Sequence, residues 1–421
     1  MRFVFTDIKI RDFVFIFCLV FSFYIVSFVQ SSMLIGGISL IYILSNYKKT
    51  RSLLSFLGNR YCFPILFFPL FIITNCLLFS MIHFTFDFSY LKSVISLYIK
   101  IFFIFFAVEY IYTRNKNIEY YEKIIVYIFT LQSIIQIVAF LNPSIANILH
   151  YFNHAGELYV REGGRRGLAL SGGTGWSLGL TYGLSFIFYT KLFLLKKKIS
   201  FYSIIIGIFL LLGVFFSGRS AYFGIVVSII YFFLSKRMTL YSKIKIIILF
   251  CFFLLLSIFT VYLVFYDFAN FLVDRIFPWA FEFFYQLDKT GKLQTGSTNR
   301  LLEMWQEAYL ITSKSILLGE GYFTDPLTNR YYHMVDVGYL RNIFYWGIFG
   351  SIFIYTYQVM IFIKILLSED KEKILLILSL LFYLFVMELK AMTVGFNHIS
   401  MTICIMYSLL NIKYSLNKGN T

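Results

Sequence analysis

Long apolar stretches follow one another along almost the whole chain, separated by short polar breaks. Each stretch has about 16–25 residues, the length that an α-helix needs to cross a bilayer. The pattern predicts an all-α polytopic membrane protein, a single membrane domain over residues 1–421 with about twelve transmembrane helices. The predicted spans are 12–29, 32–46, 61–82, 89–112, 124–141, 175–194, 199–216, 220–235, 246–266, 343–366, 374–392 and 396–414.

Two longer polar segments interrupt this pattern, at residues 142–173 and 267–342, and we expect both to be large loops outside the bilayer. In the second loop, apolar residues repeat at helical spacing after Ser297. They predict an amphipathic helix over 298–312 that lies near the membrane-water boundary. Its apolar positions are Leu301, Met304, Trp305, Ala308 and Ile311, and on its polar side Arg300 and Glu303 have the spacing of an i,i+3 ion pair.

The composition supports a membrane location, because 59% of the residues are hydrophobic and only 14% are charged. The net charge of +16 comes from lysines and arginines that gather before the first span and in alternate short loops. Positive charge is retained on the cytoplasmic side, so both termini are predicted to be cytoplasmic and both large loops periplasmic. The positive net charge therefore reflects the membrane topology of the chain, and no nucleic-acid partner is expected. The basic groups lie at 2–11, 48–51, 114–123, 196–198, 236–245 and 371–373.

Neither a metal nor a cofactor is predicted. The five cysteines lie in or beside apolar stretches without CxxC spacing, which is typical of packing residues. His150 and His154 have the i,i+4 spacing of two metal ligands on a helix, but no carboxylate or third histidine accompanies them.

Several arginines fall on the predicted periplasmic side, where they form candidate pyrophosphate-binding residues. Arginine presents a planar fork of donors that pairs with two phosphate oxygens at once and keeps its charge when partly desolvated. The alternative is that each guanidinium extends to the lipid headgroups. The arginines are Arg165, Arg166, Arg219, Arg300 and Arg341. Charged residues within predicted spans are also functional candidates, namely Lys92, Lys100, Glu109, Glu388 and Lys390.

The segment before the span at 343–366 carries the candidate catalytic residues. Asp336 and His333 are three residues apart, close enough on a helix to share a face. One could accept a proton from a substrate hydroxyl while the other orients it, with Tyr339 as a further substrate contact. The alternative role for Asp336 is to cap the helix that opens the span.

Three stretches resemble the O-antigen polymerases (Wzy type) and, more distantly, the O-antigen ligases of the same superfamily. They are SGRS at 217–220, NRLLEMWQEAYLITSKSILLGEGYF at 299–323 and DVGYLRNIFYWGIFG at 336–350. RRGLALSGGTGW at 165–176 is similar to the family's arginine-bearing first large loop. The chain departs from the ligase pattern at Asp336, where ligases have a histidine about three residues before Tyr-Leu.

The resemblance implies a membrane glycosyltransferase of the bacterial inner membrane that acts in lipopolysaccharide O-antigen biosynthesis. It would join oligosaccharide repeat units carried on undecaprenyl pyrophosphate, at the periplasmic face. Its partners would be these lipid-linked oligosaccharides, the lipid bilayer, and a chain-length regulator and a flippase of the same pathway. Two alternatives remain: an O-antigen ligase, which differs only in its acceptor, or a lipid-linked oligosaccharide flippase. The two large outer loops argue against the flippase.

Overall fold

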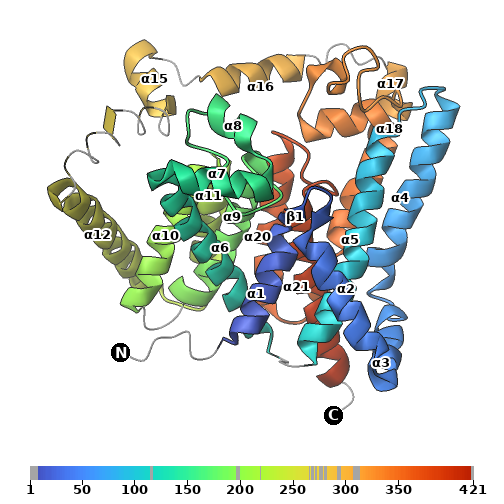
Figure 1. Cartoon of the computed structure of the whole chain (residues 1–421), viewed down its shortest axis with the longest axis horizontal. Helices are drawn as coiled ribbons and strands as arrows, with labels where there is room; N and C mark the ends of the chain where they lie inside the picture. Colours follow the sequence, from blue (N-terminus) through green and yellow to red (C-terminus); the bar gives the residue numbers. More distant parts are fainter. Residues whose placement is uncertain are drawn as a thin grey trace.

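The computed structural model describes residues 8–113, 117–195, 200–218, 220–264, 266, 270, 273–274, 278, 282–291, 295–306 and 313–418, and it is mostly helical (Figure 1). The prediction of an all-α membrane protein is confirmed at this level. The helices are α1 (Ile10–Phe21), α2 (Ser31–Leu44), α3 (Tyr47–Leu57), α4 (Phe63–Ile82), α5 (Ser89–Tyr112), α6 (Ile118–Leu141), α7 (Pro143–Asn153), α8 (Gly156–Arg161), α9 (Trp176–Tyr189), α10 (Phe201–Ser217), α11 (Ala221–Leu234), α12 (Leu240–Val264), α15 (Glu282–Thr290), α16 (Gly296–Gln306), α17 (Ser313–Leu318), α18 (Gly338–Met360), α19 (Ile363–Leu366), α20 (Lys371–Glu388) and α21 (His398–Lys418). A short antiparallel hairpin, β1 (Tyr24–Val26) and β2 (Val29–Gln30), follows α1.

Within the described residues, seven helices are long and apolar enough to cross a membrane: Phe63–Ile82, Ser89–Tyr112, Ile118–Leu141, Trp176–Leu194, Leu240–Thr260, Gly338–Met360 and His398–Leu416. Three shorter apolar helices, α2, α10 and α11, fall on other predicted spans. The remaining predicted spans correspond to α1 and α20, which are short or carry charges at their ends. Seven spans are therefore supported directly, and the number twelve stays a prediction.

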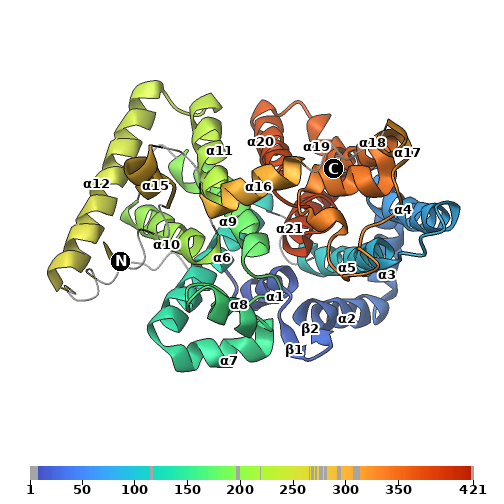
Figure 2. The ribbon, with the colours of Figure 1, turned by 90° about the horizontal axis from the view of Figure 1, so that it is seen from above.

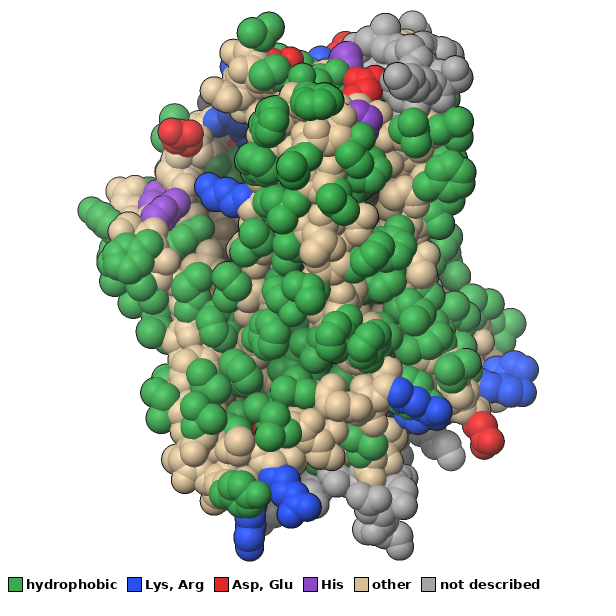
Figure 3. Space-filling model, turned by 90° about the vertical axis from the view of Figure 1, so that its right-hand side faces the viewer, with side chains coloured by type: hydrophobic (Ala, Val, Ile, Leu, Met, Phe, Trp, Pro, Cys, Tyr) green, Lys and Arg blue, Asp and Glu red, His purple; other side chains and the backbone are tan. Residues whose placement is uncertain are grey.

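The ends of the helices fall at two opposite edges of the molecule. In Figure 1, α8, α16 and α17 lie along the upper edge, while α1 begins and α21 ends near the lower edge. Hydrophobic side chains cover the middle of the face in Figure 3, and charged side chains lie mainly toward its two ends. An apolar belt of this kind is suited to contact with lipid tails.

The first predicted span, 12–29, is wrong in length, because α1 ends at Phe21 and the hairpin follows. Ser22 adopts a left-handed conformation with φ of 49°, which ends the helix. The N–H of Gly172 then donates to the carbonyl of Phe21 at 2.8 Å. A Cβ atom on Gly172 would lie 2.3 Å from the Ser22 carbonyl oxygen, so this approach requires glycine. A distant segment of the first large loop thus covers the end of α1.

The predicted first loop, 142–173, contains α7 and α8 before an irregular stretch. The predicted second loop, 267–342, ends earlier than expected, because α18 begins at Gly338. Tyr339 and Arg341 therefore lie in α18.

A break in α18 holds the second loop in place. Gly347 has a φ of 69° inside the helix, and the backbone of 317–321 packs against this point. The N–H of Glu320 donates to the Phe344 carbonyl at 2.6 Å. Asp87 adds a second anchor, since one of its carboxylate oxygens accepts from the N–H groups of Phe323 and Thr324, each at 2.7 Å. Residues 317–324 are therefore fixed against the first part of α18 and against Asp87.

Most of the buried carboxylates among the apolar helices have partners. Glu109 pairs with Lys413, and Glu122 pairs with Lys191. Glu388 accepts hydrogen bonds from the backbone N–H groups of Thr393 and Val394. The two ion pairs join helical segments that are distant in sequence, whereas the Glu388 contacts are local. In each case the partner offsets the cost of a buried charge.

Candidate active site

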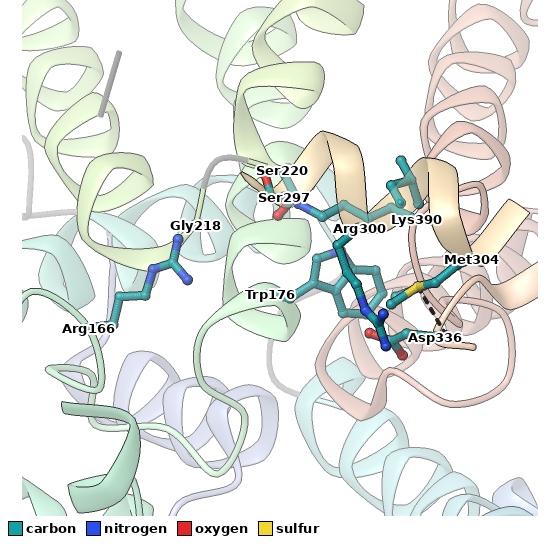
Figure 4. A pocket seen from close by; sticks show the side chains of 11 residues that line it. Arg166, Trp176, Gly218, Ser220, Ser297, Arg300, Met304, Asp336 and Lys390 are labelled. Carbon is teal, nitrogen blue, oxygen red and sulfur yellow. Dashed lines mark hydrogen bonds between the residues drawn. The ribbon is translucent and has the colours of Figure 1, made fainter. Parts of the chain in front are cut away.

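A cavity of about 230 Å³ lies beneath α16, and we call it the Asp336 cavity. Seen from above, α16 crosses between α9 and α21 (Figure 2). The cavity combines side chains from the first loop, the start of α9, the turn between α10 and α11, α16, the segment before α18 and the segment after α20 (Figure 4). Its lining residues are Arg166, Trp176, Gly218, Ser220, Ser297, Arg300, Leu301, Met304, Asp336, Lys390 and Ala391.

Three of the predicted site residues meet at this cavity: Arg166, Arg300 and Asp336. Arg166 is held by Glu162, with its Nη1 3.5 Å from a carboxylate oxygen. Arg300 lies on α16 and pairs with Glu303 at 3.0 Å, which confirms the predicted i,i+3 pair. The structure thus brings two arginines and a carboxylate to one cavity from segments far apart in sequence.

The position of Arg300 follows from the amphipathic character of α16. Leu301, Met304 and Trp305 pack against a small apolar cluster formed by Val335, Val337, Leu340 and Phe344. The sulfur of Met304 also accepts the N–H of Asp336 at 3.5 Å. The predicted amphipathic helix is therefore observed over Gly296–Gln306, and residues 307–312 of the prediction lie outside the described residues.

Asp336 lies in the extended segment between a short 3₁₀ turn (Tyr332–Met334) and α18. Burial raises the pKa of its carboxyl group, and the charges of Arg341 and Lys390 oppose this only in part. A raised pKa makes the ionised carboxylate a better proton acceptor. The helix cap of α18 is Val337, without a side-chain hydrogen bond, so the alternative role of Asp336 as its cap is wrong.

Three further lining residues were not among the predicted site residues. Lys390 is a functional candidate in the sequence only as a charge within a predicted span. In the structure it lines the cavity, whereas Glu388 belongs to a buried hydrogen-bond network. The indole nitrogen of Trp176 and the hydroxyl of Ser220 are buried, and neither has a hydrogen-bond partner among the described residues. Both residues belong to the stretches that resemble the polymerase family, and that was the available signal.

Other predicted residues lie outside this lining. Arg341 is 7% exposed and sits between the rings of Phe323 and Tyr331, 3.9 and 3.8 Å from their centroids. It does not line the cavity, but its charge opposes the rise in the pKa of Asp336. Arg165 is half-buried and does not line the cavity. Arg219 lies outside the described residues, although its neighbours Gly218 and Ser220 both line the cavity.

His333 and Tyr339 also point elsewhere. His333 has a left-handed backbone and its ring lies against Tyr332 and Phe344, with centroids 4.3 and 5.0 Å apart. The expectation that it shares a helix face with Asp336 is wrong, because no helix joins the two. The hydroxyl of Tyr339 donates to the carbonyl of Phe385 at 2.9 Å, which ties α18 to α20.

No family model, curated protein or solved structure matches this chain. The chemical character of the cavity is therefore the guide to function. Its arginines and lysine favour an anion, and its carboxylate has a raised affinity for a proton. A reaction in which an anionic group leaves while a hydroxyl loses its proton needs both features.

Proposed function

We propose that the protein is a membrane glycosyltransferase that joins lipid-linked oligosaccharide repeat units, the activity implied by its resemblance to the O-antigen polymerases. The donor is a glycan on undecaprenyl pyrophosphate, and the acceptor is a sugar hydroxyl of a second lipid-linked unit. The observation that supports this best is the meeting of Arg166, Arg300 and Lys390 with Asp336 at one cavity. Arginines that only extended to lipid headgroups would have no reason to converge on a carboxylate.

In the proposed reaction the acceptor hydroxyl attacks the anomeric carbon of the donor sugar. The bond between that carbon and the pyrophosphate oxygen breaks, and the electron pair leaves with the pyrophosphate. Asp336 takes the proton of the hydroxyl, while the three cations stabilise the negative charge that develops on the leaving group.

Deletion of the gene tests this function directly. We expect surface polysaccharide from the deletion strain to migrate on a gel as a single repeat unit, because capping of the lipid core continues without polymerisation. The long-chain ladder should return when the wild-type gene is supplied on a plasmid. Loss of every repeat unit would contradict the proposal and favour a ligase or a flippase.

The proposed localisation is the bacterial inner membrane, with both termini in the cytoplasm and the Asp336 cavity facing the periplasm. The pathway's flippase would deliver its substrates there, and a chain-length regulator would limit the product. The distribution of lysine and arginine among the short loops supports this orientation.

Reporter fusions test the orientation. Gly163 and Gly291 are exposed positions in the two large loops, and a periplasmic phosphatase fused at either should be active. A fusion at the exposed Gly58, close to the basic stretch 48–51, is the matched control and should be inactive. Phosphatase activity only at Gly58 would reverse the orientation and move the cavity to the cytoplasm.

A further inference from the structure

A second polar cavity of about 390 Å³ lies beside the segment that forms one wall of the Asp336 cavity. Gly172, Gly173 and Ser177 line this second cavity, whereas Trp176 of the same segment lines the first. The hairpin β1–β2, which lies at the upper end of α1 in Figure 1, contributes Tyr24 and Gln30 to its lining. We call it the Lys100 cavity, and its other lining residues are Phe21, Ser22, Tyr24, Gln30, Ser96, Lys100, Phe396, His398 and Ile399.

Lys100 is the unusual residue of this cavity. It is 5% exposed and belongs to α5, one of the helices long enough to cross a membrane. Among the described residues its ammonium group forms no ion pair or hydrogen bond, and none of the described residues that line the cavity is acidic. The buried lysines Lys191 and Lys413 differ, since each is paired with a glutamate.

A buried ammonium without a counter-ion is unfavourable, and because Lys100 is almost fully enclosed, a counter-ion has to enter the cavity to reach it. Lys100 lies 11 residues after Ser89, the first residue of α5, and so about 16 Å from that end along the helix axis. His398 lies near enough to act on it electrostatically, and it adds a donor rather than a negative charge. No described residue that lines the cavity therefore supplies an anion for Lys100.

The remaining polar groups are those that bind oxygen atoms. Ser22, Ser96 and Ser177 contribute hydroxyl groups, and Gln30 contributes an amide. Lys92, Ser96 and Lys100 follow one another at intervals of four residues and so form one stripe along α5, in which the first two are exposed. This stripe leads from the end of the helix into the cavity and provides a charged path for an anionic group.

We propose that the Lys100 cavity is a second anion site, which receives the phosphate group of a lipid. A phosphate carries several acceptor oxygens in different directions, as the surrounding hydroxyl and amide groups require. The negative charge of the phosphate neutralises the ammonium group of Lys100. The lipid is either a membrane phospholipid or a polyprenyl phosphate. This second anion site does not depend on whether the Asp336 cavity is catalytic.

The test measures the unfolding temperature of the full chain, purified in dodecyl maltoside without phosphate. Three probes are added separately: inorganic phosphate, phosphatidylglycerol and undecaprenyl phosphate. We expect at least one lipid phosphate to raise the unfolding temperature of the wild type. Lys100→Met should lose this rise and, without any probe, should unfold at the same or a higher temperature, because an unpaired charge has been removed.

Lys413→Met is the matched control, because it removes a buried lysine that has a partner. It should unfold at a lower temperature, since Glu109 is left unpaired, and it should keep the rise caused by the lipid. Ser96→Ala keeps the charge of the cavity and removes one donor, so the affinity for the lipid should fall about tenfold.

The three probes separate the sources of the phosphate. A rise with phosphatidylglycerol alone assigns a membrane phospholipid, and a rise with undecaprenyl phosphate alone assigns a polyprenyl carrier. The proposal is overturned by a wild type that responds to no lipid phosphate, or by an equal rise in Lys100→Met. It is also overturned if Lys100→Met unfolds well below the wild type without any probe, because the lysine then has a structural partner.

Discussion

Asp336→Asn is expected to reduce the rate of repeat-unit joining by about 10²–10⁴-fold, the contribution typical of a positioned general base. Asparagine has nearly the same shape but cannot take up a proton. Loss of a helix cap cannot explain such an effect, because Val337 occupies the cap position of α18. The measurement is the rate of chain extension from purified lipid-linked repeat units in vesicles that contain the protein.

Asp325→Asn is the matched control for this substitution. Asp325 lies in the same loop, and its carboxylate accepts from the N–H groups of Leu327 and Thr328, which asparagine can also do. We expect wild-type rates from it. Near wild-type chain length from Asp336→Asn, at normal protein abundance, would remove Asp336 as the base.

The pH profile adds a second readout for Asp336. Its pKa is raised by burial, so the carboxylate takes up a proton at a higher pH than a free aspartate, whose pKa is about 3.9. A protonated base is inactive. The rate of the wild type should therefore fall on the acid side at a pH above this ordinary value, and the fall should be absent from the residual rate of Asp336→Asn.

Arg166→Ala is expected to lower the rate by about 10²–10³-fold. This is the typical effect of removing one preorganised group that stabilises a developing negative charge. Arg166→Lys retains the charge but loses the planar fork, so its rate should fall between those of the wild type and the alanine variant. The measurement is the same vesicle assay, with protein abundance checked by immunoblot.

Arg161→Ala provides the matched control for Arg166. Both arginines approach the carboxylate of Glu162, at 3.7 Å for Arg161 and 3.5 Å for Arg166. Arg161 is 74% exposed and does not line the cavity, whereas Arg166 is 18% exposed and does. If both alanine variants lose activity equally, the cause is the Glu162 network, and the role of Arg166 in binding the leaving group is wrong.

The predictions that held best depend on residues close in sequence. The amphipathic spacing of Leu301, Met304 and Trp305 located α16, and the i,i+3 spacing of Arg300 and Glu303 gave an observed ion pair. A helical face and a pair one turn apart follow from the geometry of a single helix. No information about the rest of the chain is needed for either.

The prediction of 12–29 as one span failed for the opposite reason. Residues 12–29 are apolar enough to continue a helix, but Ser22 adopts a left-handed conformation and Gly172 donates to the carbonyl of Phe21. The residue that covers the end of α1 lies in the first large loop. The hydropathy of residues 12–29 cannot predict this contact.

The candidate site was predicted only in part. Arg166, Arg300 and Asp336 were chosen for their chemistry, and the fold brings them to one cavity together with Lys390. Arg341 and His333 were chosen on the same grounds, yet their side chains lie against aromatic rings. Residue type does not separate these cases, because the direction of a side chain depends on what packs around it.

The sequence by itself determined that the chain is an all-α membrane protein and where most of its apolar helices run, because hydropathy and helical periodicity are properties of neighbouring residues. Only the tertiary structure decided which charges meet. Lys413 neutralises Glu109, Lys390 joins Asp336, and Lys100 remains without a partner among the described residues. The distance between two charges depends on how helices far apart in the chain pack, and the free energy of a buried charge is set by that distance.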